Sequence, residues 1–157
     1  MAKEPDRPNI SPMVHPPIVA LMFIVIAYFL ARFFPVPFVA PLVLQYIGLG
    51  LSFIGFLLGI GAFAEFRKAR TTLDPHGSAR QLVISGIYRF TRNPIYLGFL
   101  LMVIGLPLNS GLYWGVVMAP LYMMTMTRLV IEQEEAYLER RFKDVYADYK
   151  SRVRRWL

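Results

Sequence analysis

The sequence predicts an all-α integral membrane protein: a helical bundle of about four transmembrane helices followed by an amphipathic cytoplasmic helix. Only 17% of its 157 residues are charged, against about 25% in a typical soluble domain. The charges are nearly absent from 8–31, 33–64 and 93–127, and they crowd into the segments between and after these runs. A chain of this length has room for one domain, so 1–157 is predicted to form a single unit.

Four apolar runs are the candidate spans, because crossing about 30 Å of hydrocarbon takes roughly 20 helical residues. The first is 17–34, which we expect to be retained because no small-residue cleavage site follows it. It forms a membrane anchor, 17–66, together with the second run, 41–66. The third run, 94–108, is short, and the fourth is 112–131.

The second run is rich in glycine: Gly48, Gly50, Gly55, Gly59 and Gly61. Small residues spaced four apart, such as Gly55 and Gly59, let another helix approach closely. We therefore predict a packing seam on this helix. The same seam is a candidate surface for a homodimer.

The positions of lysine and arginine predict the orientation of the bundle. Bases occur in the N-terminal tail, in 67–92 and from Arg128 onward, whereas the turn 107–111 has none and the turn 35–40 has only the nearby Arg32. Basic and base-poor connections therefore alternate, as four spans require. We expect both termini to be cytoplasmic and the chain to lie in the inner (plasma) membrane of the cell.

The composition also excludes several classes of partner and site. The basic residues behind the net charge of +7 lie beside the apolar runs, where anionic lipid and membrane topology account for them. Nucleic acid is therefore not an expected partner. The absence of cysteine excludes disulfides and thiolate metal sites. His15 and His76 are far apart in the sequence and sit beside prolines, so we expect no metal.

Two polar cytoplasmic segments are candidates for a functional site. The first, 71–92, mixes turn formers with aromatic residues and arginines, and it runs into Asn93 and Pro94. Proline favours the first position of a helix, and the free N–H groups of such a helix start, together with Arg92, suit an anionic group. The second segment begins with the acids of 132–135 and continues at helical spacing. On the residues alone, solvated acids and an aromatic stripe against lipid headgroups are an equally open interpretation.

Several motifs occur in these segments in a fixed order: 82–88, 92–98, Glu134 and Glu135 with Leu138, then Phe142, Tyr146 and Tyr149. With an apolar hairpin between them, they resemble the isoprenylcysteine carboxyl methyltransferase family. Phospholipid N-methyltransferases are more distant membrane relatives of that family. The resemblance covers about 71–157, which we expect to be the cofactor-binding half of the chain.

This resemblance implies an integral membrane methyltransferase that uses S-adenosylmethionine, releases S-adenosylhomocysteine and needs no metal. It implies that the cofactor lies in a cytoplasmic pocket while a lipidic substrate enters sideways from the bilayer. By motif position, the residues that it assigns to cofactor binding are Arg80, Gln81, Leu82, Val83, Tyr88, Asn93 and Glu134.

Three more residues are candidates for the catalytic part of the site. Arg92 would neutralise the cofactor carboxylate or a substrate anion, or it would only mark the topology. Eukaryotic members of the resembled family have a substrate-binding arginine where this chain has Val130, and His where it has Asn93. The nearest arginine is Arg128, about 200° around the helix from Val130, and it is the candidate for an anionic acceptor. Glu135 would orient Arg92 or Arg128 through a salt bridge, or contact the cofactor.

The sequence leaves the methyl acceptor open. A lipophilic or small-molecule acceptor is expected, and a prenylcysteine-like carboxylate is one form of it. A phospholipid N-methyltransferase-like enzyme is the alternative within the same class. A non-enzymatic membrane scaffold or accessory protein is the alternative from a different class.

Overall fold

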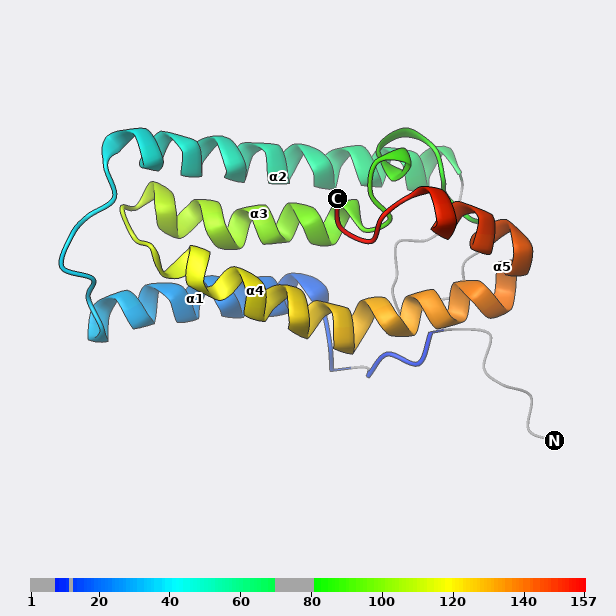
Figure 1. Cartoon of the computed structure of the whole chain (residues 1–157), viewed down its shortest axis with the longest axis horizontal. Coiled ribbons are helices and arrows are strands. Elements are labelled where there is room, and N and C mark those ends of the chain that lie inside the picture. Colours follow the sequence, from blue (N-terminus) through cyan, green and yellow to red (C-terminus); the bar gives the residue numbers. More distant parts are fainter. Residues whose placement is uncertain (1–7, 12, 70–80) are drawn as a thin grey trace.

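The chain folds into a bundle of helices (Figure 1). The computed structural model describes residues 8–11, 13–69 and 81–157. All regular secondary structure in this part of the chain is helical, which confirms the predicted fold class. The elements are α1 (Pro16–Phe33), α2 (Leu42–Lys68), the 3₁₀ helix η1 (Gly86–Arg89), α3 (Pro94–Asn109), α4 (Trp114–Met126), the π-helix η2 (Thr127–Ile131) and α5 (Glu132–Arg152).

Three of the described helices are long and apolar enough to cross a membrane: Pro16–Phe33, Leu42–Lys68 and the continuous helix Trp114–Arg152. The helix α3 is apolar but has only 16 residues, about 24 Å at 1.5 Å per residue. It is therefore shorter than a hydrocarbon core of about 30 Å, as the short third run predicted. The large apolar side chains exposed on α1 and α2 are those that a membrane protein turns toward lipid.

The short helix α3 occupies the centre of the bundle (Figure 1). It packs against α2 on one side and against α1 and α4 on the other. Its buried residues, among them Leu97, Leu100 and Val103, belong to the main hydrophobic core together with Tyr122 and Met126 of the following helix. A central helix need not reach both membrane surfaces to be stable, because its neighbours cover it with apolar side chains.

The two base-poor turns meet at one end of the bundle. The backbone N–H of Ala40 donates to the carbonyl of Gly111 over 3.0 Å, and the indole Nε1 of Trp114 donates to the carbonyl of Phe34 over 3.0 Å. The polar elements η1 and α5 lie at the opposite end (Figure 1). The alternation of charge along the sequence therefore becomes a separation between the two ends of the bundle.

The glycine seam lies between α2 and α3. A Cβ atom added at Gly55 would come within 2.5 Å of the carbonyl oxygen of Gly98, and one at Gly48 within 2.7 Å of the carbonyl oxygen of Gly105. A Cβ at Gly59, by contrast, would meet nothing within 4 Å. The close approach is therefore made by glycines seven residues apart on each helix, not by the pair spaced four apart.

The continuous helix from α4 to α5 contains two irregularities. The first is η2, whose wide turn changes the rotation of the helix just before the acids of α5. The second is Lys143, whose φ of 43° and ψ of −120° interrupt α5. The chain bends there and its last part folds back toward α3 (Figure 1).

Candidate functional site

The start of α3 is one wall of the candidate site. The helix begins at Pro94, as predicted. The hydroxyl Oγ1 of Thr91, a buried residue, accepts the backbone N–H of Asn93 over 3.2 Å. This short-range contact fixes the turn that carries Arg92 and Asn93 into the polar end of the bundle.

The last residues of the chain, 153–157, lie against this turn. The backbone N–H of Arg92 donates to the carbonyl of Arg154 over 3.0 Å. The carbonyl of Arg155 accepts two hydrogen bonds, from Thr91 Oγ1 over 3.2 Å and from Asn93 Nδ2 over 2.9 Å. The side chain of Asn93, assigned to the cofactor by resemblance, therefore binds the C-terminal segment in this structure.

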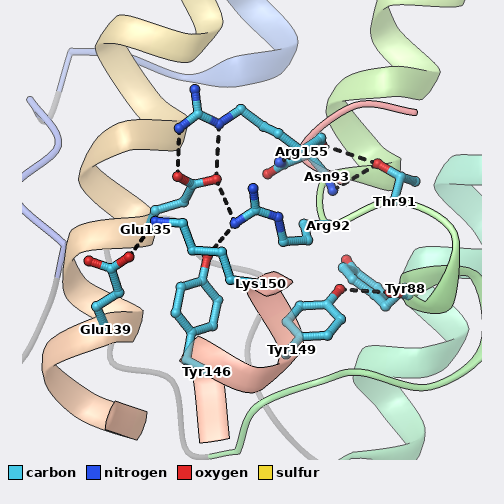
Figure 2. Close-up of polar contacts among 10 residues, drawn as sticks. All are labelled: Tyr88, Thr91, Arg92, Asn93, Glu135, Glu139, Tyr146, Tyr149, Lys150 and Arg155. Carbon is cyan, nitrogen blue, oxygen red and sulfur yellow. Dashed lines mark hydrogen bonds and ion pairs between the residues drawn. The ribbon is translucent and has the colours of Figure 1, made fainter. Parts of the chain in front are cut away.

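Glu135 lies at the centre of a buried ion cluster with Arg92 and Arg155 (Figure 2). Arg155 donates from Nε to Oε1 over 3.0 Å and from NH2 to Oε2 over 2.7 Å. Arg92 NH1 is 3.2 Å from Oε1, and the side chains of Arg92 and Glu135 are only 9% and 8% exposed. Of the two partners considered for Glu135, the structure pairs it with Arg92 and not with Arg128.

The cluster of Glu135, Arg92 and Arg155 has two guanidinium groups for one carboxylate, so it carries a net positive charge. Within the described residues, no acceptor reaches the buried Nε of Arg92. A buried donor without a partner costs about 1–3 kcal/mol. The arrangement is therefore suited to an additional anionic group at Arg92.

Two tyrosines of α5 reach this region because the helix bends at Lys143. Arg92 NH1 donates to the hydroxyl of Tyr146 over 3.4 Å. The hydroxyl of Tyr149 donates to the backbone carbonyl of Tyr88 over 2.7 Å, and both contacts appear in Figure 2. The end of α5 thereby joins η1 to the ion cluster.

Glu134 faces the start of α3. The hydroxyl of Tyr96 donates to its Oε1 over 2.7 Å, and the hydroxyl of Tyr122 donates to the Tyr96 carbonyl over 3.4 Å. Burial raises the pKa of the Tyr88 phenol, and the neighbouring Glu134 carboxylate raises it further. The motif 92–98, which contains Tyr96, and the paired acids are far apart in the sequence but therefore lie close together.

The other residues predicted to bind the cofactor differ in how far they are buried. Val83 is buried in a small apolar cluster with Ala62 and Tyr88. Leu82 is half-buried and Gln81 is exposed. Arg80 lies outside the described residues, so its predicted contact with the cofactor stays a prediction.

Arg128 lies on η2 and is exposed, whereas Val130 is fully buried. The π-helical turn reduces the rotation per residue between these positions and the acids of α5, an effect that ordinary helical spacing does not predict. Within the described residues, the ion pairs of Glu135 are with Arg92 and Arg155, and Arg128 takes no part in them. Its assignment to an anionic acceptor stays a prediction.

The sequence did not indicate a role in the site for two of the residues found there, Arg155 and Glu65. Arg155 was counted only as a topological charge, and no motif pointed to the fold-back of 153–157. Glu65 is the one acid in α2 and is only 8% exposed. An isolated acid at the end of an apolar run was the available signal, because ionisable groups at membrane depth tend to be functional.

A groove about 290 Å³ in volume lies between α2 and α3, below this polar end. Its lining carries no charged or hydrogen-bonding side chain: Gly55, Phe56, Gly59, Ile60, Phe63, Ile95, Phe99 and Met102. Phe56, Ile60 and Phe63 are half-exposed on the outer surface of the bundle. The groove is therefore open toward the side on which a bilayer would lie.

Comparison with known proteins gives three matches. Residues 43–145 match the phospholipid methyltransferase family. A protein of Haemophilus influenzae, described as uncharacterized, is 39% identical over 66 residues, which are 40% of this chain and 100% of that protein. The protein-S-isoprenylcysteine O-methyltransferase of Schizosaccharomyces pombe is 33% identical over 72 residues, 46% of this chain but only 30% of that enzyme.

Proposed function

The chain belongs to the phospholipid methyltransferase family, and from this premise we propose that it is a membrane enzyme that transfers a methyl group from S-adenosylmethionine to a lipophilic acceptor. The observation that carries the proposal is that contacts with Tyr96, Glu135 and Tyr149 hold Glu134, Arg92 and Tyr88, respectively, at one end of the bundle. The resemblance to the isoprenylcysteine carboxyl methyltransferase family assigns Glu134 and Tyr88 to the cofactor.

The residues present fit the charges of this cofactor. Its amino-acid part has a carboxylate, which suits the unpartnered Nε of Arg92 and the net positive charge around Glu135. Its ammonium group and ribose hydroxyls are donors, which suit the partly buried carboxylate of Glu134. Charge-assisted hydrogen bonds of this kind are roughly twice as strong as neutral ones.

The protein's task in this reaction is to position the partners and exclude water. S-adenosylmethionine, when bound, supplies a methyl group on a positively charged sulfur, and as the methyl passes to the acceptor the electron pair of the broken C–S bond stays on that sulfur. Arg92, Glu134 and Tyr88 hold and orient the ligand, and such orientation lowers a barrier by roughly 7–11 kcal/mol. A carboxylate acceptor needs no base, whereas an amine or thiol must first lose a proton.

The groove between α2 and α3 fits the hydrocarbon part of an acceptor. It is wholly apolar, it opens on the outer surface, and Ile95 at its polar end is separated from Asn93 by Pro94 alone. A lipid chain in this groove would present its head group near the start of α3. The same groove accommodates a phospholipid or a prenylated acceptor, so the acceptor class must be decided by assay.

The orientation of the bundle belongs to the proposal as well. Most lysines and arginines of the described residues belong to the end of α2, to η1 and to α5 with the residues after it, and the positive-inside rule places such an end in the cytoplasm. Both termini and the site would then face the cytoplasm.

Calorimetric titration of the detergent-purified full chain with S-adenosylhomocysteine tests the proposal. We expect micromolar binding that falls at least tenfold in Glu134→Ala and less in Glu134→Gln, which keeps an oxygen acceptor for Tyr96. Glu139→Ala is the matched control, because Glu139 is an exposed acid on the same helix that pairs with Lys150. Wild-type protein that shows no binding at millimolar ligand would support the non-enzymatic alternative.

Incubation with labelled S-adenosylmethionine then identifies the acceptor. Label transferred to an added phospholipid would indicate a phospholipid N-methyltransferase activity. Label transferred to a prenylcysteine would indicate a carboxyl methyltransferase activity. A total lipid extract serves as the unbiased arm of the same assay.

A further inference from the structure

Glu65 is a buried acid near the polar end of α2. It is the only acid in that helix, and only 8% of its surface is exposed. Burying an ionised carboxylate beside apolar residues is unfavourable unless it is paired and hydrogen-bonded. The partners of Glu65 therefore indicate what the side chain does.

One partner is the turn that precedes η1. The hydroxyl of Ser85 donates to Glu65 Oε2 over 2.5 Å. Gly86, the next residue, has a φ of +59°, and a Cβ atom added there would lie 2.5 Å from the carboxyl carbon of Glu65. The turn is thus seated directly on the carboxylate, with no space between them for any side chain.

Among the described residues, a second partner is Lys68, whose Nζ lies 2.7 Å from Glu65 Oε1. The Lys68 side chain is 72% exposed, so this ion pair is largely solvated and contributes little to stability. The two contacts of Glu65 therefore differ in kind. The contact with Lys68 is a surface pair, while the contact with Ser85 joins α2 to a segment twenty residues further along the chain.

The turn leads directly into the part of η1 that carries Tyr88. The Tyr88 ring packs edge-on against Phe66, the neighbour of Glu65, with ring centroids 5.7 Å apart. On the other side, Tyr149 donates to the Tyr88 carbonyl over 2.7 Å. The helix η1 is therefore held from two sides, by the end of α2 and by the end of α5.

We propose that Glu65 is a positioning residue of the cofactor site: its carboxylate holds the Ser85–Gly86 turn, and the turn sets the place of Tyr88 against the end of α5. This inference rests on the proposed function, because Tyr88 and Glu134 are its cofactor contacts. Glu65 acts through the turn and does not itself touch the ligand.

The test is the dissociation constant of S-adenosylhomocysteine for the full chain, measured by calorimetry. Glu65→Ala should weaken binding about tenfold, and Ser85→Ala several-fold, since each removes one side of the same hydrogen bond. Glu65→Gln should recover most of the affinity because its carboxamide oxygen still accepts from Ser85. Lys68→Ala, the matched control, should stay within about twofold of wild type because its ion pair is solvated.

A double-mutant cycle separates positioning from general destabilisation. If the hydrogen bond is responsible, Ser85→Ala should have little further effect in the Glu65→Ala background. Independent, additive losses would overturn the inference, as would wild-type affinity in Glu65→Ala. Should Glu65→Ala fail to fold, Glu65→Gln and Ser85→Ala still test the inference. Ser85→Ala should weaken binding, whereas Glu65→Gln should keep most of the affinity, and equal affinities for the two variants would overturn the inference.

Amide hydrogen exchange without any ligand provides a readout that does not depend on the proposed function. The amides of Tyr88 and Phe90, bonded to the carbonyls of Ser85 and Ile87, should exchange faster in Ser85→Ala, while the amides of α3 should not change. Unchanged exchange in η1 would overturn the role of Glu65. Failure of the wild-type chain to bind S-adenosylhomocysteine would instead overturn the proposed function, whatever the exchange data show.

Discussion

Arg155 binds the carboxylate of Glu135 through two parallel hydrogen bonds, from Nε over 3.0 Å and from NH2 over 2.7 Å. The hydrogen bonds to Glu135 raise the pKa of the Arg155 guanidinium, so this arginine stays protonated at neutral pH. The backbone carbonyl of the same arginine accepts from Thr91 and Asn93. One residue near the end of the chain therefore joins α5 to the start of α3.

Arg155→Ala should destabilise the polar end of the bundle. The variant leaves the buried Glu135 with Arg92 as its remaining partner in the cluster. Breaking a fully buried pair costs about 3–5 kcal/mol, and we expect about 1–3 kcal/mol here because one partner remains and Arg155 is 32% exposed. Thermal unfolding in detergent measures the loss.

Arg154→Ala is the control for that prediction, because Arg154 is exposed and contributes its backbone carbonyl to the contact with Arg92. Its unfolding temperature should match that of wild type. Equal unfolding temperatures for Arg155→Ala and Arg154→Ala would mean that the ion cluster does not hold the C-terminal segment.

Tyr149→Phe should weaken cofactor binding more than it weakens the fold. It removes the buried hydrogen bond to the Tyr88 carbonyl, a net loss of about 1 kcal/mol, at the point where η1 meets α5. We expect a several-fold higher dissociation constant for S-adenosylhomocysteine. Tyr46→Phe, which alters an exposed tyrosine of α2, should bind as wild type does, and equal affinities for both variants would count against the assignment of Tyr88.

Much of the fold followed from the sequence because its signals are local. Apolar length predicted the helices, and Pro94 marked the start of α3 correctly. The short third run also indicated a helix unlike the others, which in the structure is the central one. Each of these signals lies within about 25 residues of sequence, which is why composition and spacing were sufficient.

The candidate site followed only in part, because its remaining contacts are long-range. The motifs placed Glu134 near Tyr88, but no spacing indicated that Arg155 would return to Glu135. The C-terminal segment reaches Glu135 because of two irregularities in the helix: η2 changes the helical phase, and Lys143 bends α5. Neither has a sequence signature, since no glycine or proline marks the bend.

The packing of α2 on α3 gives a prediction that needs no ligand. Gly55→Ala would place a Cβ atom 2.5 Å from the carbonyl oxygen of Gly98, so the two helices must separate. Overpacking of this kind costs about 1–3 kcal/mol. Gly59→Ala is the matched control four residues away, because its Cβ would meet nothing within 4 Å.

Thermal unfolding of these two variants decides the geometry of the seam. Gly55→Ala should unfold at a lower temperature than wild type. Gly59→Ala should unfold at the wild-type temperature or above it, because alanine is more favourable than glycine inside a helix by about 1 kcal/mol. Similar losses in both variants would instead indicate a surface that uses the glycines spaced four apart, such as a homodimer contact.

The bend at Lys143 gives the last prediction. A φ of 43° with a ψ of −120° is sparsely populated for a residue with a Cβ atom and costs about 1–3 kcal/mol. Glycine adopts a positive φ freely but loses about 0.5–1 kcal/mol to its greater freedom in the unfolded chain. Lys143→Gly should therefore unfold at or slightly above the temperature of Lys143→Ala, which keeps the Cβ and removes only the charge. Lys143→Val should be less stable than both, because a β-branched side chain is the least compatible with positive φ. If glycine proved the least stable of the three, α5 would be straight at this position, and Tyr146 and Tyr149 would not reach Arg92 and Tyr88.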